Sequence, residues 1–168
     1  HVIYNDSTHK YVLWGHHVIS SGHSTAVVAY NDSPTGAFTV ATSSYNPDGL
    51  YLNDMNLYKD VDGQAYLLYS IGTNTQFVIS RLTSDYLQTS GTYITPAVLV
   101  GREAPAMILR NGVYFLLTSG LSGWAPNENK YSTSTSVMGT WSSLTDPFQT
   151  SVLEDRLTAY HSQTTDIQ

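Results

Sequence analysis

Residues 58–70 read YKDVDGQAYLLYS, and the pair Asp62-Gly63 separates two runs of aromatic and aliphatic residues. An Asp-Gly pair readily adopts the positive φ angles of a tight turn, so this stretch predicts a β-hairpin. The same order occurs in residues 109–119, LRNGVYFLLTS, where Asn111-Gly112 forms the turn. It occurs again in residues 4–14, YNDSTHKYVLW, with a longer polar loop. The hairpin is therefore a repeated unit.

The repeat has a period of about 50 residues, because Tyr11, Tyr66 and Tyr114 occupy the equivalent place in the three hairpins. Each hairpin is followed by another β-like run. No segment carries apolar residues at helical spacing over three turns, so we expect essentially no helix. Short strands repeated at this period are typical of the blades of a β-propeller.

The pattern predicts an all-β fold in one domain, a partial β-propeller over residues 1–168. The blade repeats are expected near 1–50, 51–100 and 101–158, with the next blade starting at about 159. A propeller has at least four blades and would need roughly 200 residues at this period, more than the 168 present. We therefore expect the chain to be part of a larger propeller. A sandwich of three repeats is the alternative.

The composition excludes several classes of function. A net charge of −6 with seven Lys and Arg residues gives no basic surface for nucleic acid or for an anionic membrane. No apolar run approaches the ~18 residues of a membrane-spanning helix. The absence of Cys excludes disulfides and thiol nucleophiles. The 13 Tyr residues, with abundant Ser and Thr, favour a neutral polar ligand such as a sugar.

Two carboxyl side chains stand out on the strands expected to line the propeller channel. Asp54 in residues 52–57 and Glu103 in residues 102–107 precede their hairpins at nearly equal distances. We therefore predict that they meet from adjacent blades. A carboxyl that is buried near a second negative charge has a raised pKa, which suits a general acid. The alternative is a structural ion pair of Glu103 with Arg102, with Asp54 capping a turn.

A loop over residues 119–127, SGLSGWAPN, follows the third hairpin. Trp124 offers a flat apolar face to a sugar ring, and Asn127 offers both a donor and an acceptor to sugar hydroxyls. The alternative for Trp124 is packing between blades. We expect Trp14 and Trp141 to be structural, because they lie on a strand edge and at a blade closure.

Other kinds of site are not indicated. His16-His17 and His23 lie near a Ser/Gly loop, but no carboxylate stands at metal-ligand spacing, so we expect no metal and no cofactor. The serines lack a GxSxG setting, and no phosphate-binding Gly-rich loop is present. In residues 159–167, where we expect the next inner strand, His161 and Gln163 are placed to face the channel.

Several of these motifs occur together in one known family. The motifs are VIYND with KYVLW at 2–14, NDMNLYKDVDGQAYLLYS at 53–70, REAPAM with NGVYFLLTSG at 102–120, GWAPN at 123–127 and SQTT at 162–165. In these the chain resembles glycoside hydrolase family 43, and most nearly its exo-β-1,3-galactanases (galactan 1,3-β-galactosidases). The fold of that family is a five-bladed β-propeller. The resemblance implies that the chain covers about three blades and the start of a fourth.

The resemblance also implies roles for individual residues. Glu103 of the EAP motif corresponds to the general acid, and Asp54 to the residue that orients this acid and raises its pKa. Asn53 stands where the subgroup commonly has Arg. The SQ-T motif implies that Gln163 takes the place of the conventional general base. We expect substrate contacts from four residues: Trp124, Asn127, Asn53 and Tyr160.

The implied reaction is hydrolysis of β-1,3-linked galactan with inversion, in which the acid protonates the glycosidic oxygen while water attacks the opposite face. The implied partner is a polysaccharide or oligosaccharide, the β-1,3-galactan of arabinogalactan, and the implied protein is a secreted, extracellular monomer. One alternative is another activity of the family, an α-L-arabinofuranosidase or β-xylosidase, which requires an Asp on a further blade. A non-catalytic sugar-binding propeller is the other alternative.

Overall fold

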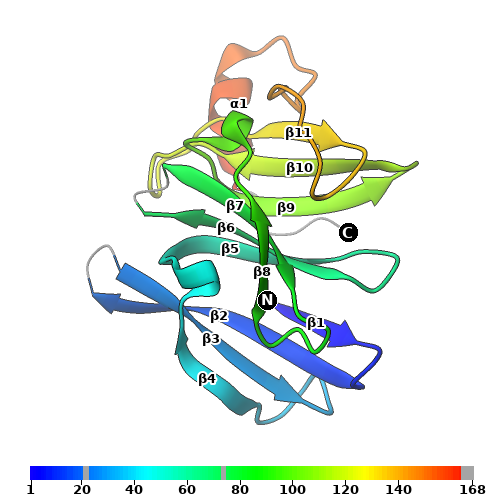
Figure 1. Cartoon of the computed structure of the whole chain (residues 1–168). Coiled ribbons are helices and arrows are strands. Elements are labelled where there is room, and N and C mark those ends of the chain that lie inside the picture. The colour runs from blue at the N-terminus through cyan, green and yellow to red at the C-terminus, as the bar shows by residue number, and fades with distance from the viewer. Residues whose placement is uncertain (21–22, 73–74, 164–168) are drawn as a thin grey trace.

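The computed structural model describes residues 1–20, 23–72 and 75–163. Its strands form three antiparallel sheets that follow one another along the chain (Figure 1). The first sheet contains β1 (Val2–Asn5), β2 (Lys10–Ser20), β3 (His23–Asn31) and β4 (Thr39–Tyr45). The second contains β5 (Leu52–Lys59), β6 (Ala65–Ile71), β7 (Gln76–Leu82) and β8 (Thr89–Ile94). The third contains β9 (Glu103–Arg110), β10 (Val113–Ser119) and β11 (Lys130–Ser134). The predicted all-β fold is confirmed.

The turns that the sequence indicated join the expected strands. Gly63 has a φ of +83° between β5 and β6, and Gly112 has a φ of +75° between β9 and β10. These are left-handed conformations that glycine adopts without a steric cost. The longer loop between β1 and β2 is held by Asn5, whose Oδ1 accepts hydrogen bonds from the backbone N–H groups of Ser7 and Thr8. The repeated hairpin is therefore confirmed.

The expectation of essentially no helix is wrong near the C-terminal end. The structure has a short helix, α1 (Leu153–Thr158), followed by a 3₁₀ turn, η3 (Ala159–His161), and two more 3₁₀ turns occur at η1 (Pro47–Gly49) and η2 (Ala97–Leu99). A six-residue helix is too short to show a periodic apolar pattern. The strand expected to start at about 159 is replaced over residues 159–161 by η3, while residues 164–168 lie outside the described part.

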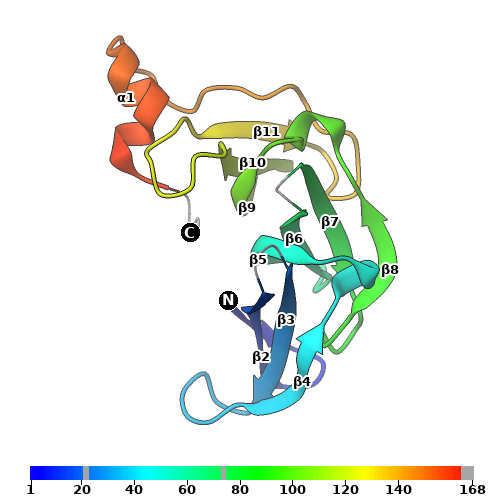
Figure 2. The same ribbon diagram turned by 90° about the vertical axis from the view of Figure 1, so that its left-hand side faces the viewer.

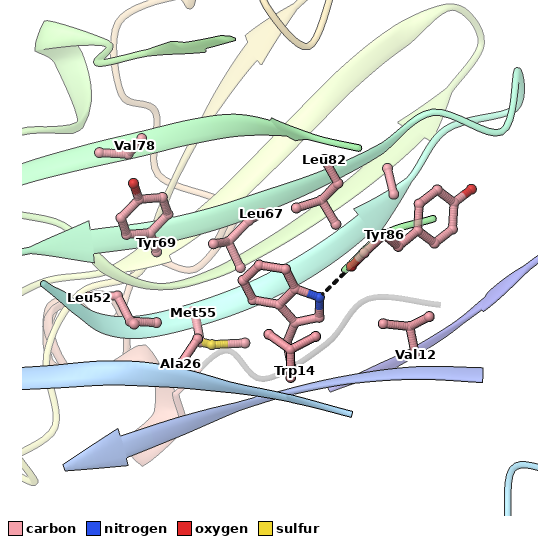
Figure 3. Close-up of a cluster of buried hydrophobic side chains, with 12 residues drawn as sticks. Val12, Trp14, Ala26, Leu52, Met55, Leu67, Tyr69, Val78, Leu82 and Tyr86 are labelled. Atoms are coloured by element: carbon pink, nitrogen blue, oxygen red, sulfur yellow. Dashed lines mark hydrogen bonds between the residues drawn. The ribbon is translucent and has the colours of Figure 1, made fainter. Parts of the chain in front are cut away.

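The middle sheet is buried on both faces, as an internal blade would be. Side chains alternate along β6, so Leu67 and Tyr69 belong to the cluster shared with the first sheet, whereas Leu68 packs in the cluster shared with the third. Trp14 is fully buried in the first cluster, where its Nε1 donates to the carbonyl oxygen of Tyr86 at 2.8 Å (Figure 3). Trp141 is buried in the second cluster. The prediction that both tryptophans are structural is confirmed.

The three sheets are arranged in an arc, which Figure 2 shows from the side. Strands β5 and β9 lie toward its concave side, and β4 and β8 lie toward its outer side. Among the residues described, no helix has the length and hydropathy needed to cross a bilayer. The arc places the predicted inner strands, and therefore Asp54 and Glu103, on a common side.

Candidate active site

Glu103 is the first residue of β9, and its direction is set by a β-bulge. The pairing of β9 with β10 runs from Ala106–Leu117 to Glu103–Ser119, which leaves Ala104 and Pro105 opposite one residue of β10. Ala104 has a φ of +47°, a left-handed conformation that is costly for a residue with a Cβ. Bulges next to sites re-aim a neighbouring side chain. The strained backbone at Ala104 therefore directly follows Glu103 and belongs to the bulge that orients it.

Asp54 lies in an equivalent bulge on β5. The pairing of β5 with β6 runs from Leu52–Ile71 to Met55–Tyr69, so that Asn53 and Asp54 lie opposite one residue of β6. The two bulges match in consecutive sheets, but Asp54 lies within its bulge whereas Glu103 immediately precedes the other. The sequence spacing indicated nearly equivalent positions for the two acids, and the ladders offset them by two residues.

The two acids face the same cavity. A cavity of about 160 Å³ is lined by Asp54, Glu103, Gly123, Trp124 and Gln163. A larger adjoining space of about 450 Å³ shares Asp54 and Gln163 and is completed by His1, Trp14, Gly15, His16, Met55, Ala104 and Pro105. The structure therefore brings together the three predicted catalytic residues and one predicted substrate contact. His16, which the sequence analysis weighed only as a metal ligand, lines the larger space.

Burial is the main reason why the pKa of Glu103 is raised above its ordinary value. The charge of Asp54 is the second cause, and the positive charge of Arg102 acts in the opposite direction. The Glu103 residue is only 8% exposed, so its charged form loses most of its contact with water. We predicted that repulsion from Asp54 keeps the proton on Glu103. The structure confirms that the pKa of Glu103 is raised, but it makes burial the larger cause and the charge of Asp54 the smaller one.

Arg102 directs its donors away from the cavity. Its Nε donates to Thr118 Oγ1 at 3.0 Å, and its Nη2 donates to the carbonyl oxygens of Thr118 at 2.7 Å and Glu128 at 3.1 Å. Burial lowers the pKa of this guanidinium. These contacts anchor β10 and the loop after it, and the pKa of Glu103 stays raised despite the neighbouring charge. The alternative of a neutralising Arg102–Glu103 pair is therefore not favoured.

Asn127 builds the loop that follows β10. Its Oδ1 accepts the backbone N–H of Gly120 at 2.8 Å, and its Nδ2 donates to the carbonyl oxygen of Gly120 at 3.1 Å and to Ser122 Oγ at 2.6 Å. The donor and acceptor that we predicted for sugar hydroxyls are thus occupied within the loop. Asn127 shapes the turn that carries Trp124 and lines a cavity with it, and its contact with substrate stays a prediction.

Trp124 is 99% exposed, so it does not pack between the three sheets of the described residues. It lines the cavity of Asp54 and Glu103 and also a neighbouring one of about 210 Å³. That second cavity lies between the 123–127 loop and residues 161–163. The indole therefore stands at the entrance to both spaces, as a ligand platform would.

Gln163 connects the C-terminal segment to β10, the strand that pairs with β9. Its Nε2 donates to Ser119 Oγ at 3.2 Å, and Ser119 is the residue paired with Glu103 across the sheet. His161 lines the second cavity beside Gln163. The last two residues of the SQTT motif lie outside the described residues. The catalytic role of Gln163 stays a prediction, but its side chain is at the site.

The two remaining predicted substrate contacts lie elsewhere. The Nδ2 of Asn53 donates to the carbonyl oxygen of Gly72. Tyr160 packs edge-on against Phe148, with ring centroids 5.2 Å apart. Neither lines the cavities formed by the described residues around the two acids. Within the same part of the chain, no group of three or more His, Asp and Glu side chains is placed to hold a metal ion.

Two carboxyls that line one cavity, as Asp54 and Glu103 do, are the arrangement by which glycoside hydrolases cleave glycosidic bonds. The comparisons agree with this class, since the family model described as glycosyl hydrolases family 43 matches residues 5–165. The chain belongs to glycosyl hydrolases family 43. No match was found among the curated proteins.

Solved structures of similar proteins share the fold. A family 43 β-1,3-galactosidase with galactodeoxynojirimycin has 29% identity and a TM-score of 0.86 over 99% of this chain. An exo-β-1,3-galactanase from Clostridium thermocellum has 34% identity and a TM-score of 0.85 over 98%. An exo-β-1,3-galactanase from Phanerochaete chrysosporium with galactose has 36% identity and a TM-score of 0.78 over 86%. The chain spans 61%, 37% and 34% of the length of these three proteins, respectively.

Proposed function

We propose that this protein is a glycosidase that releases galactose from β-1,3-linked galactan with inversion at the anomeric carbon. The observation that carries the proposal is the buried carboxyl of Glu103, whose pKa is raised and which faces the same cavity as Asp54. The similarity to β-1,3-galactosidases and exo-β-1,3-galactanases supports the choice of substrate. A variant of the Phanerochaete chrysosporium enzyme was solved with β-1,3-galactotriose.

In the proposed reaction Glu103 is the general acid. It holds a proton because water is excluded around it, and it gives this proton to the glycosidic oxygen as the bond from that oxygen to the anomeric carbon breaks. Asp54 lines the same cavity, where its negative charge disfavours a second negative charge on Glu103 before the proton is given up. The acid is thereby kept in its active form at a higher pH than a solvated glutamic acid.

Gln163 is proposed to hold the attacking water. An amide oxygen accepts a hydrogen bond but does not take a proton as a carboxylate does, so its contribution is orientation. The bond from Nε2 to Ser119 Oγ fixes the amide and leaves its oxygen for the water. The proton of the water leaves to solvent. Because Ser119 pairs with Glu103 across the sheet, the residue that bonds Gln163 lies directly beside the proposed acid.

Trp124 is proposed to stack against the sugar at the mouth of the cavity. Its indole is exposed, and a flat apolar face suits the C–H side of a galactose ring. The further proposals are that the enzyme acts outside the cell, as a monomer and without a cofactor.

The replacement Glu103→Gln in the full-length protein tests the acid role. Release of galactose from β-1,3-galactobiose should fall by about 10²- to 10⁴-fold, the usual contribution of a general acid. Binding of the disaccharide, measured by calorimetry, should be nearly unchanged. A galactoside whose leaving group needs no protonation should lose far less rate.

The matched control is Glu128→Gln, because the Glu128 carboxyl forms a surface ion pair with Lys130 at 3.0 Å. This variant should keep its activity. Full turnover of the disaccharide by Glu103→Gln would remove Glu103 from the acid role. An NMR spectrum of the first product should show α-galactose, and β-galactose would contradict inversion. Arabinofuranosides and xylosides, assayed in parallel, decide between activities within the family.

A further inference from the structure

Asn56 connects the two strands that carry the acids. It lies on β5, two residues after Asp54, and is only 4% exposed. Its Nδ2 donates to the carbonyl oxygen of Pro105 on β9 at 2.9 Å, and its Oδ1 accepts the backbone N–H of Leu57 at 2.7 Å. The amide oxygen of Asn56 is therefore bonded to its own strand, β5, and the amide nitrogen is bonded to the neighbouring strand, β9.

The acceptor of this bond lies inside the bulge of β9. Pro105 and Ala104 are the two residues of the bulge, and Glu103 immediately precedes them. Because β5 and β9 belong to separate hydrogen-bonded sheets, the backbone ladders do not fix one strand against the other. The Asn56–Pro105 bond spans this boundary beside the site. It is thus a direct polar link between the strand of Asp54 and the strand of Glu103.

The bulge needs such a restraint because of its strain. A non-glycine residue at the φ of Ala104 persists only when its surroundings hold it there. Loss of the Asn56 donor would leave a buried carbonyl without this partner, and the bulge would gain by turning that carbonyl toward water. Such a rotation changes the backbone at Pro105 and Ala106. Once the bulge is no longer held against β5, its strain at Ala104 can relax and move Glu103 relative to Asp54.

We propose that Asn56 is a positioning residue that sets the approach of Glu103 to Asp54 and to the substrate by holding the β9 bulge against β5. This inference rests on the proposed function, because it gives Glu103 its task. Asn56 itself lines none of the described cavities and acts through Pro105. A displacement of about 1 Å at a reacting group can cost up to about 10²-fold in rate.

The chain supplies a matched control in Asn5. This residue is also an almost fully buried asparagine whose Nδ2 donates to a backbone carbonyl across two sheets, that of Ser84 at 2.8 Å. Its bond connects the first and second sheets and touches neither acid strand. The variants Asn56→Ala and Asn5→Ala therefore remove similar bonds with and without a connection to the site.

The experiment compares both variants in the full-length protein by thermal melting, by kcat and KM on β-1,3-galactobiose, and by an NMR titration of Glu103. Both variants should lose stability. Only Asn56→Ala should lose kcat by about tenfold to a hundredfold with little change in KM, and only in it should the pKa of Glu103 move toward its ordinary value. If both variants lose kcat equally, or if Asn56→Ala keeps its rate and its Glu103 titration, the inference is overturned.

The NMR titration separates this inference from the proposed function. A shifted Glu103 titration in Asn56→Ala, in a protein that cleaves no galactan, would uphold the positioning role and reject the activity. If Asn56→Ala does not fold, Asn56→Ser keeps a small polar side chain at the position but does not reach Pro105. The same titration and kinetic results are expected of it, and a wild-type pattern in this variant would overturn the proposal.

Discussion

Glu103 and Asp54 line one cavity from neighbouring sheets, Asp54 within the bulge of β5 and Glu103 immediately before the bulge of β9. Each bulge places two residues opposite one on the partner strand, and regular pairing resumes at Met55 on β5 and at Ala106 on β9. Burial and the charge of Asp54 both raise the pKa of Glu103, and these two causes can be separated by substitution.

Asp54→Asn should move the high-pH limb of the kcat/KM profile to lower pH. The variant removes the second cause of the raised Glu103 pKa and leaves burial, so the acid loses its proton earlier but still above its ordinary pKa. The profile on β-1,3-galactobiose measures the shift. Asp32→Asn, which removes a surface carboxylate paired with Lys10, is the control and should leave the limb in place. An unmoved limb in Asp54→Asn would exclude the electrostatic effect of Asp54.

Glu103→Gln should make the protein more stable at neutral and alkaline pH. The pKa of Glu103 is higher in the folded state than in the unfolded state, so between the two values the native protein binds more protons. The free energy of unfolding therefore falls as pH rises through this window. The neutral Gln avoids that loss, and its advantage should vanish below about pH 4, near the ordinary pKa of Glu. Urea denaturation of both proteins across pH measures this, and parallel curves would contradict it.

Trp14→Phe should weaken the junction of the first and second sheets. The Phe ring keeps much of the buried apolar surface but leaves the carbonyl of Tyr86 without its indole donor. An unsatisfied buried polar group costs about 1–3 kcal/mol. Trp14→Ala should cost more, about 3–5 kcal/mol, because it also leaves a cavity. Denaturant titration gives both free energies of unfolding, and a Trp14→Phe variant as stable as wild type would show that the hydrogen bond contributes nothing beyond packing.

Trp124→Ala should weaken sugar binding without weakening the fold. The side chain is almost fully exposed, so the free energy of unfolding should stay within about 0.5 kcal/mol of wild type. Affinity for β-1,3-galactobiose should fall by about tenfold, or ~1.4 kcal/mol. Trp141→Ala is the contrasting variant, because Trp141 is buried and should lose about 3–5 kcal/mol of stability. Unchanged affinity in Trp124→Ala would remove the indole from the substrate site.

Much of the fold follows from local sequence signals. Asp62-Gly63 and Asn111-Gly112 specify their turns because few other pairs accept positive φ, and the apolar runs beside them specify the strands. The placement of Asp54 and Glu103 on the inner strands of consecutive sheets also follows, since both precede equivalent hairpins at nearly equal distances, although the ladders place Glu103 two residues further from its turn than Asp54. These features depend on neighbours along the chain, so a sequence contains them directly.

Other features depend on contacts that no spacing shows. The amide of Asn127 looks suited to a ligand in the sequence, but the loop closes on it and uses all three of its hydrogen bonds. Asn56 reads as one more polar residue on an inner strand, and its partner lies 49 residues away. The helix α1 is too short for a periodic signal. The Asn56 bond depends on how whole sheets pack against each other, whereas the Asn127 bonds depend on how its own loop closes.

Because the three tryptophans differ in exposure, their intrinsic fluorescence can report on the cavity. Trp14 and Trp141 are shielded inside the sheet packing, whereas Trp124 stands in water at the mouth of the cavity. Acrylamide should therefore quench one emitter out of three, the one with the red-shifted spectrum. A sugar seated on that indole would protect it, so fluorescence can follow occupancy without any label.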